Sequence, residues 1–153
     1  MLQLFVYGSL KRGFHNHANY VPSPARIEDA RVWGRLYGLK YGFPALEIAP
    51  QQVLLNGSGD PESDLQQQRT ASPLEFARPE GDWDLVHGEL VTLVNPRRDL
   101  PAVDRLEAFR PGRRSLYQRS LVPVQTDRGV IAGWVYWMHR VGSGQRLRSG
   151  RWE

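Results

Sequence analysis

The sequence of 153 residues contains no cysteine, so disulfide bonds and thiolate chemistry are excluded, and a zinc site would need histidine and carboxylate ligands alone. No apolar run approaches about 18 residues, which excludes a membrane-spanning helix. Met1 is followed by a strand-like segment and not by a basic region with a longer apolar stretch. We therefore expect no signal peptide, no membrane partner and a cytoplasmic location.

Lysine is scarce, because Lys11 and Lys40 are the only two lysines among 20 basic side chains. The other 18 are arginines, which fork onto carboxylates and phosphates and stack on aromatic rings. Residues 1–96 carry 8 basic and 11 acidic side chains, net −3, whereas residues 97–153 carry 12 and 5, net +7. This asymmetry indicates either nucleic-acid binding, the less favoured interpretation, or charge pairing within the fold.

The length suits one domain, and 41% hydrophobic residues are enough for a core. Alternating or β-rich patterns predict about six strands, and two short segments favour helices. The strands fall at 2–7, 30–40, 43–48, 85–94, 116–124 and 130–139, the last two joined by a tight turn at 126–129, and the helices at 10–20 and 101–109. We predict an α+β fold, a small, strongly curved mixed sheet or barrel with two short helices at its mouth.

Two segments show no sustained period. Residues 51–82 are rich in glutamine, glycine and acids, and a loop of this length is unusual inside a compact domain. We interpret them as a polar insertion, either a mobile surface loop or a lid. Residues 140–153 hold glycine, serine and arginine, and we expect a flexible basic tail after a domain of residues 1–139.

The bend after the first strand is one candidate site. Gly8 lets the chain turn tightly between Tyr7 and Leu10, and Ser9 can cap the helix that follows. Amides at such a helix start bind carboxylates, phosphates or a developing oxyanion. A plain strand–turn–helix junction explains the same residues.

Two carboxylates form a second candidate site. Asp104 and Glu107 lie three residues apart, beside the apolar stripe of the helix predicted at 101–109. Partial burial there would raise their pKa toward a value useful for proton transfer. The alternative is a solvated helix flank that pairs with Arg105 or Arg110.

Other chemical signals are weaker. His15 and His17 would not face each other on a helix, so we expect no metal site there. His87 and His139 are single strand residues that suit a structural role. Trp134, Tyr136 and Trp137 could stack on bases, but filling the core of a small barrel is the favoured interpretation.

Taken together, the segments resemble the γ-glutamylcyclotransferase superfamily, in particular its γ-glutamylamine cyclotransferase branch and small AIG2-like relatives. Five blocks in family order carry the resemblance, and they cover nearly everything except residues 51–82 and the tail. The blocks are Phe5-Val6-Tyr7-Gly8-Ser9-Leu10-Lys11-Arg12-Gly13 with Asn16-His17; Val32-x-Gly34-x-Leu36-Tyr37 with Phe43-Pro44-Ala45-Leu46; His87-Gly88-Glu89-Leu90; Val103-Asp104-Arg105-Leu106-Glu107 with Leu116-Tyr117-Gln118-Arg119; and Ala132-Gly133-Trp134-Val135-Tyr136.

Two positions depart from the pattern of this branch. Ser9 stands where the branch more often has threonine, which keeps the hydroxyl. Ala108 stands where glycine usually follows the glutamate, so the backbone there is less permissive. These departures leave the substrate more open than the fold.

The resemblance implies an enzyme, without cofactor or metal, that releases 5-oxoproline and a free amine from a small γ-glutamyl amine. It implies that Glu107 is the general acid/base, and we expect that carboxyl to be mostly buried with a raised pKa. The implied substrate-binding residues are Tyr7, Gly8, Ser9, Leu10, Tyr117 and Tyr136, to which we add Arg119 as a partner for a substrate carboxylate. A different γ-glutamyl conjugate, or an Arg-rich module for nucleic acid, is the alternative. The sequence leaves the leaving amine and the oligomeric state open.

Overall fold

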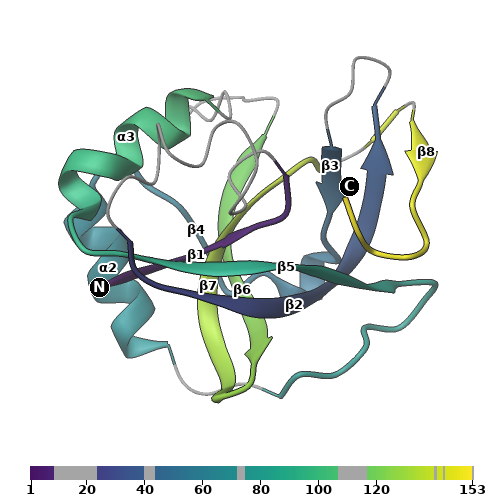
Figure 1. The fold of residues 1–153 in the computed structure, drawn as a ribbon, viewed down its shortest axis with the longest axis horizontal. Coiled ribbons are helices and arrows are strands. Elements are labelled where there is room, and N and C mark those ends of the chain that lie inside the picture. The colour runs from purple at the N-terminus through teal and green to yellow at the C-terminus, as the bar shows by residue number, and fades with distance from the viewer. Residues whose placement is uncertain are drawn as a thin grey trace.

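The computed structural model describes residues 1–8, 24–39, 44–71, 75–106, 117–139, 141–142 and 144–152. Figure 1 shows the helices and strands of these ranges in one view. The elements in chain order are β1 (Leu2–Val6), β2 (Pro24–Gly38), β3 (Pro44–Glu47), the 3-10 turn η1 (Pro50–Gln52), β4 (Leu55–Asn56), α2 (Pro61–Thr70), β5 (Asp84–Leu93), α3 (Pro96–Leu106), β6 (Gln118–Thr126), β7 (Gly129–Trp137) and β8 (Gln145–Arg146).

Five of the described strands close into a barrel. The order β2-β5-β1-β7-β6 returns to β2, because β6 also pairs with β2 through Ala30 and Arg31. Among the described strand pairs, β1–β7 alone is parallel, so the sheet is mixed as the sequence predicted. The strands β3, β8 and β4 extend the sheet beyond the ring. The predicted α+β barrel is therefore confirmed.

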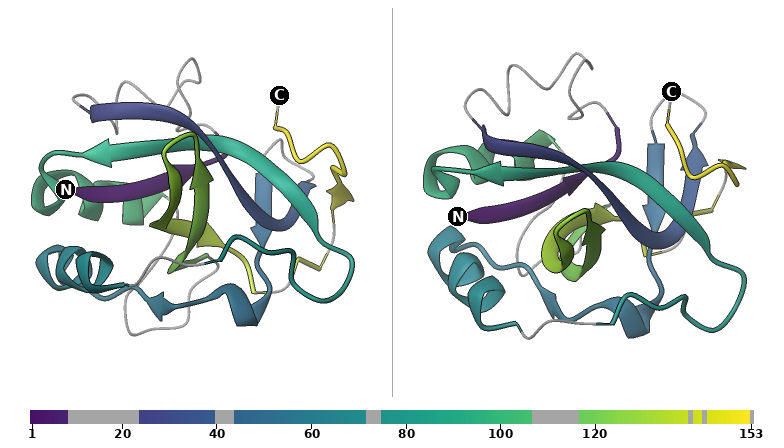
Figure 2. Two further views of the ribbon diagram at one scale, coloured as in Figure 1. Left: turned by 90° about the horizontal axis from the view of Figure 1, so that it is seen from below. Right: turned by 60° about the horizontal axis from the view of Figure 1, so that its bottom comes forward.

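The strand alternation sends side chains into two apolar clusters. In β1, Phe5 joins the cluster enclosed by the five barrel strands and β3, whereas Leu4 and Val6 join the other. The second cluster is completed by Leu100 and Val103 of α3, and Leu65 of α2 packs against it. Both helices therefore cover one side of the barrel, away from β3 and β8, as Figures 1 and 2 show.

Most predicted strands agree with the structure within a few residues. The turn predicted at 126–129 is confirmed between β6 and β7, and Gly129 there has a positive φ of 118°. The strand predicted at 30–40 is longer, because β2 begins at Pro24 and runs to Gly38. The helix predicted at 10–20 lies outside the described residues.

The helix predicted to start near Pro101 begins five residues earlier. The side chain of Asn95 accepts a hydrogen bond from the Arg98 amide at 3.2 Å, and Pro96 occupies the first helical position. That is a standard cap with proline at N1, which places Pro101 inside the helix. The apolar stripe was recognised, but this starting signal was missed.

The loop predicted for residues 51–82 is wrong for α2. Asp60 caps this helix by accepting from the Glu62 amide at 3.0 Å, with Pro61 at N1. Little of α2 is apolar, since Asp64 is its one buried residue and Leu65 packs against the barrel. The sequence of α2 therefore lacks the apolar periodicity that predicts a helix, and nothing in the sequence marks Asp64 as a buried residue.

The tail predicted to be flexible is packed. Strand β8 pairs with β2, and Leu147 and Trp152 pack against the barrel interior cluster. Arg146 donates to Asp84 at 3.0 Å and to Asp82 at 2.9 Å, so basic side chains of the tail meet acids of the preceding half. Strand pairing and ion pairs therefore connect the residues before and after the expected domain boundary at residue 139. No helix in the described part of the chain is long and apolar enough to cross a membrane.

Replacement of Gly150 tests the packing of the tail. Gly150 has a φ of +70°, and a Cβ built on it would lie 1.9 Å from the Leu85 carbonyl oxygen. We expect Gly150→Ala to lower the free energy of unfolding by about 2–3 kcal/mol, measured by urea denaturation. In Gly142→Ala, where no described atom lies within 4 Å of such a Cβ, the change should stay within about 0.5 kcal/mol. Equal stability of both variants would show that the tail does not hold the barrel.

Candidate functional site

The bend predicted as a binding site begins where β1 ends. Tyr7 and Gly8 are buried, whereas Ser9 and Leu10 lie outside the described residues. The Tyr7 hydroxyl donates to the Tyr136 carbonyl oxygen at 2.7 Å, which ties the end of β1 to β7. A Cβ on Gly8 would lie 2.7 Å from Pro44 Cγ, so the bend also packs closely on the start of β3.

Tyr117 lies at the same end of the barrel. Its hydroxyl donates to the Pro44 carbonyl oxygen at 2.8 Å, and Pro44 in turn packs against Gly8. These contacts connect the Tyr7 hydroxyl to the backbone of Tyr136, and Tyr117 through Pro44 to Gly8. That the four residues form a single site stays a prediction. Their contact with a substrate stays a prediction.

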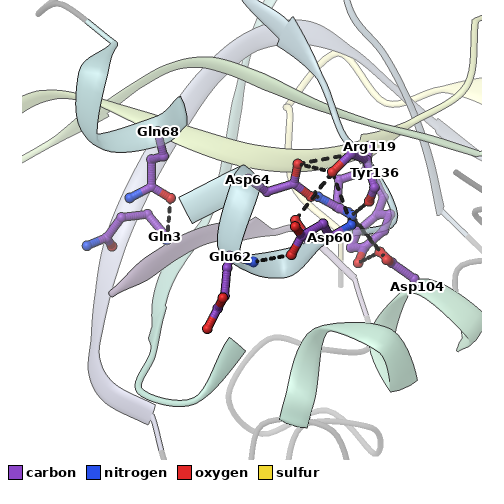
Figure 3. A network of polar contacts seen from close by, with 9 residues as sticks. Gln3, Asp60, Glu62, Asp64, Gln68, Asp104, Arg119 and Tyr136 are labelled. Carbon is purple, nitrogen blue, oxygen red and sulfur yellow. Dashed lines mark hydrogen bonds and ion pairs between the residues drawn. The ribbon is translucent and has the colours of Figure 1, made fainter. Parts of the chain in front are cut away.

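Arg119 lies at the centre of a buried polar network, shown in Figure 3. Its Nε and Nη2 donate to the two carboxylate oxygens of Asp104 at 2.8 and 3.1 Å, which is a bidentate pair. Its Nη1 donates to Asp64 at 2.8 Å, and Nη2 also donates to the Ser58 carbonyl oxygen at 2.9 Å. Arg119 is 1% exposed, and the acceptors of Asp104, Asp64 and Ser58 take the place of water around its guanidinium.

Asp104 has a second donor in the same network. The Tyr136 hydroxyl donates to Asp104 Oδ1 at 2.5 Å, and Tyr136 lies opposite Arg119 in the β6–β7 pair. A single pair of neighbouring strand positions therefore presents both groups to the last described turn of α3. Because the Tyr136 carbonyl accepts from Tyr7, the network reaches from α3 to the bend after β1.

The network buries more negative than positive charge. One guanidinium faces the carboxylates of Asp104 and Asp64, so the fully ionised group carries a net charge of −1. Burial raises the pKa of Asp104 above its ordinary value and the Asp64 charge adds to this, although Arg119 and Tyr136 act in the opposite direction. Burial tends to lower the pKa of Arg119, but Tyr136 and the two carboxylates outweigh it and raise that pKa. Burial is therefore the main reason why the pKa of Asp104 is raised within this network.

The carboxylate candidates have different outcomes. The partial burial expected for Asp104 is confirmed, since 8% of the residue is exposed, and the solvated alternative is wrong for it. Among the described side chains, its ion-pair partner is Arg119 of β6, because the helix presents this carboxylate to the barrel. The side chains of Arg105 and Arg110 lie outside the described part of the chain. Glu107 lies outside the described residues.

Sequence reasoning missed Asp64 altogether. It lay in the segment interpreted as an insertion, and its pairing with Arg119 joins residues 55 positions apart. The prediction that Arg119 binds a substrate carboxylate stays a prediction, and the bonds of the guanidinium to protein carboxylates favour a different role. Trp134, Tyr136 and Trp137 are buried in the two clusters, which confirms the core interpretation.

The protonation of Asp104 makes stability depend on pH. A raised folded-state pKa contributes stability that is fully present below the ordinary value of 3.8 and is lost as the pH rises through the folded value. We expect the free energy of unfolding of the wild type, relative to Asp104→Asn, to be larger at acid pH than near about pH 8. Urea unfolding across this range measures the difference. The opposite slope would mean that the ion pair with Arg119, and not burial, sets the pKa.

Three solved structures share the fold of this chain. YkqA from Bacillus subtilis has a TM-score of 0.60 and 21% identity, and the match covers 99% of this chain but 39% of YkqA. PH0828 from Pyrococcus horikoshii has a TM-score of 0.53 and 15% identity, with 99% of this chain and 90% of that one covered. An AIG2-like protein from Mus musculus has a TM-score of 0.51 and 21% identity, with 93% and 80% covered.

Comparison with curated proteins finds no match. A family model described as gamma-glutamyl cyclotransferase, AIG2-like, matches residues 4–58 and 64–153. The match includes both ends of the segment interpreted as an insertion and leaves out only residues 59–63 between them. It also spans the bend, both strands of the Arg119 network and the packed tail. By this match, the chain belongs to the γ-glutamyl cyclotransferase, AIG2-like family.

Proposed function

We propose that the protein is a γ-glutamylcyclotransferase that converts a γ-glutamyl amine into 5-oxoproline and a free amine. Membership of the family supports a cyclotransferase activity in general. The one observation that carries the finer proposal is the chain of contacts from Asp104 through Tyr136 to Tyr7. It connects Asp104, which lies in the last described turn of α3 and three residues before Glu107, to Tyr7 at the start of the bend after β1.

The proposed reaction needs little chemistry from the protein. The α-amine of the substrate attacks its own γ-carbonyl carbon, a new C–N bond closes the five-membered ring, and the original amide C–N bond breaks. Counted from the α-ammonium, the attacking nitrogen loses two protons and the leaving nitrogen gains two, so the amine departs as an ammonium ion and nothing is oxidised or reduced. The substrate supplies the nucleophile, and the protein must orient the glutamyl chain, move the proton and stabilise the oxyanion.

The proposal gives each predicted residue one task. Glu107 takes the proton of the α-ammonium and returns it to the leaving amine. The bend of residues 7–10 offers backbone amides to the carboxylate and the carbonyl oxygen of the substrate. Tyr117 bonds to Pro44, which packs on Gly8, and the Tyr136 carbonyl accepts from Tyr7, which supports the placement of both residues near the described start of that bend.

The arginine-rich composition has an explanation within the fold. Arg128 pairs with Glu28, Arg35 with Glu47, and Arg146 with Asp82 and Asp84. A nucleic-acid-binding surface would need to present such arginines to phosphates. In this fold they are paired with carboxylates of the same chain. These ion pairs favour the enzyme over the alternative of an Arg-rich binding module.

The proposal is tested with a panel of γ-glutamyl amines and γ-glutamyl peptides, in which 5-oxoproline is detected by mass. We expect release from at least one γ-glutamyl amine and a loss of about 100-fold or more in kcat for Glu107→Gln, because the proton carrier is removed. Glu75→Gln makes the same chemical change at an exposed site and should keep the native rate.

Three results would count against the proposal. A folded Glu107→Gln variant with native turnover would remove Glu107 from the reaction. Release of 5-oxoproline from γ-glutamyl peptides alone would show that the substrate is a γ-glutamyl peptide and not a γ-glutamyl amine. No release from any compound, together with salt-sensitive retention on a polyanion column, would favour the nucleic-acid alternative.

A further inference from the structure

We propose that Asp64 and Arg119 are positioning residues of the cyclotransferase site, which hold the last described turn of α3 at a fixed place beside the barrel. Neither side chain is assigned contact with the substrate. The inference rests on the proposed function, because its purpose is to place the segment that leads to Glu107. It gives Arg119 this role in place of the substrate contact suggested by the sequence.

The Asp64 carboxylate is the end of this chain of ion pairs that lies in α2. Its side chain is 3% exposed and accepts from the Ser58 amide at 3.1 and 3.2 Å, the Ser58 hydroxyl at 2.8 Å and Arg119 Nη1 at 2.8 Å. All of these groups are donors, so only an acceptor with two free oxygens satisfies them. An asparagine would turn an NH2 group toward at least one donor.

Arg119 transmits this constraint from α2 to α3. Asp64 and the Ser58 carbonyl oxygen fix one edge of the guanidinium, and the planar fork then directs Nε and Nη2 at Asp104. The guanidinium carbon lies 5.3 Å from the centre of the Trp134 ring, which packs beside it. Loss of Asp64 would leave one face of the group without its carboxylate partner, so its orientation would loosen.

Asp104 is the end of this chain of ion pairs that lies in α3. It is the last residue of α3 whose side chain the structure describes, and its carboxylate is held by Arg119 and by the Tyr136 hydroxyl. Figure 3 shows Asp64 and Asp104 reaching Arg119 from two different helices. A small shift of this turn would move the chain that continues to Glu107, and misplacement of a catalytic group by about 1 Å can cost about 100-fold in rate.

The link to α2 lies at the one internal break in the match to the family model. Residues 59–63 fall outside the match, and they stand between Ser58 and Asp64, both of which contact Arg119. The five residues include Asp60 and Pro61, which start α2 and so set the position of Asp64. The structure therefore assigns this short, divergent stretch a part in ordering the site.

The test compares Asp64→Asn with Glu62→Gln, which neutralises an exposed carboxylate of the same helix. Among the described residues, the Glu62 side chain pairs with Arg97 at the surface, whereas the carboxylates bonded to Arg119 are those of Asp64 and Asp104. Hydrogen exchange of peptides covering residues 100–106 reports the order of α3 without any substrate. Steady-state kinetics on the best γ-glutamyl compound of the panel reports the effect on the reaction.

We expect amides of residues 100–106 to exchange at least about tenfold faster in Asp64→Asn, and at the wild-type rate in Glu62→Gln. We expect kcat to fall about tenfold or more, with KM changed by less than about threefold, because orientation and not binding is lost. Should Asp64→Asn fail to fold, Ser58→Ala removes one donor to Asp64 and should move both readouts in the same direction by less.

Two results overturn the inference. Unchanged exchange over residues 100–106 would show that Asp64 does not order α3. Faster exchange with unchanged kcat would show that the ordering is structural only. If the wild type releases no 5-oxoproline, the proposed function fails by itself, and the exchange data still decide whether Asp64 and Arg119 hold α3.

Discussion

The ion-pair network around Arg119 is the interaction on which the arrangement of this end of the molecule depends. A buried charge is costly unless nearby groups of opposite charge and hydrogen bonds replace its hydration. Arg119 meets this requirement by gathering one carboxylate from each helix and a carbonyl from the segment before α2. Removing one partner of such a network typically costs about 3–5 kcal/mol, because the remaining charge stays buried.

The barrel supplies the fixed frame for this network. Its closure depends on β2, which pairs with β5 along most of its length and with β6 through Ala30 and Arg31. Beyond the ring, the far end of β2 also pairs with β3 and β8. Arg119 and Tyr136 face each other across β6 and β7, which are part of the closed ring. The polar groups that organise α3 are therefore mounted on the most constrained part of the chain, whereas α2 and α3 are attached to it from outside.

The network also connects electrostatics with the proposed reaction. Burial raises the pKa of Asp104, three residues before Glu107 in the chain, and the charges of Arg119 and Asp64 act on that pKa in opposite directions. Asp64 contributes to that shift although it lies in a different helix. A reaction that moves a proton beside this network would be affected by changes in α2 through both position and charge.

The sequence by itself determined the barrel strands, the turn at Gly129 and the family blocks, whereas for Asp104 it left burial and a solvated helix flank open. Those features depend on local alternation, turn chemistry and spacing, which are written in neighbouring residues. Only the tertiary structure decided that Asp64 is the partner of Arg119, that α2 is a helix and that the tail packs on β2. The physical reason is that a polar or arginine-rich segment has no apolar period to reveal it, because its place is set by charges far away in the chain.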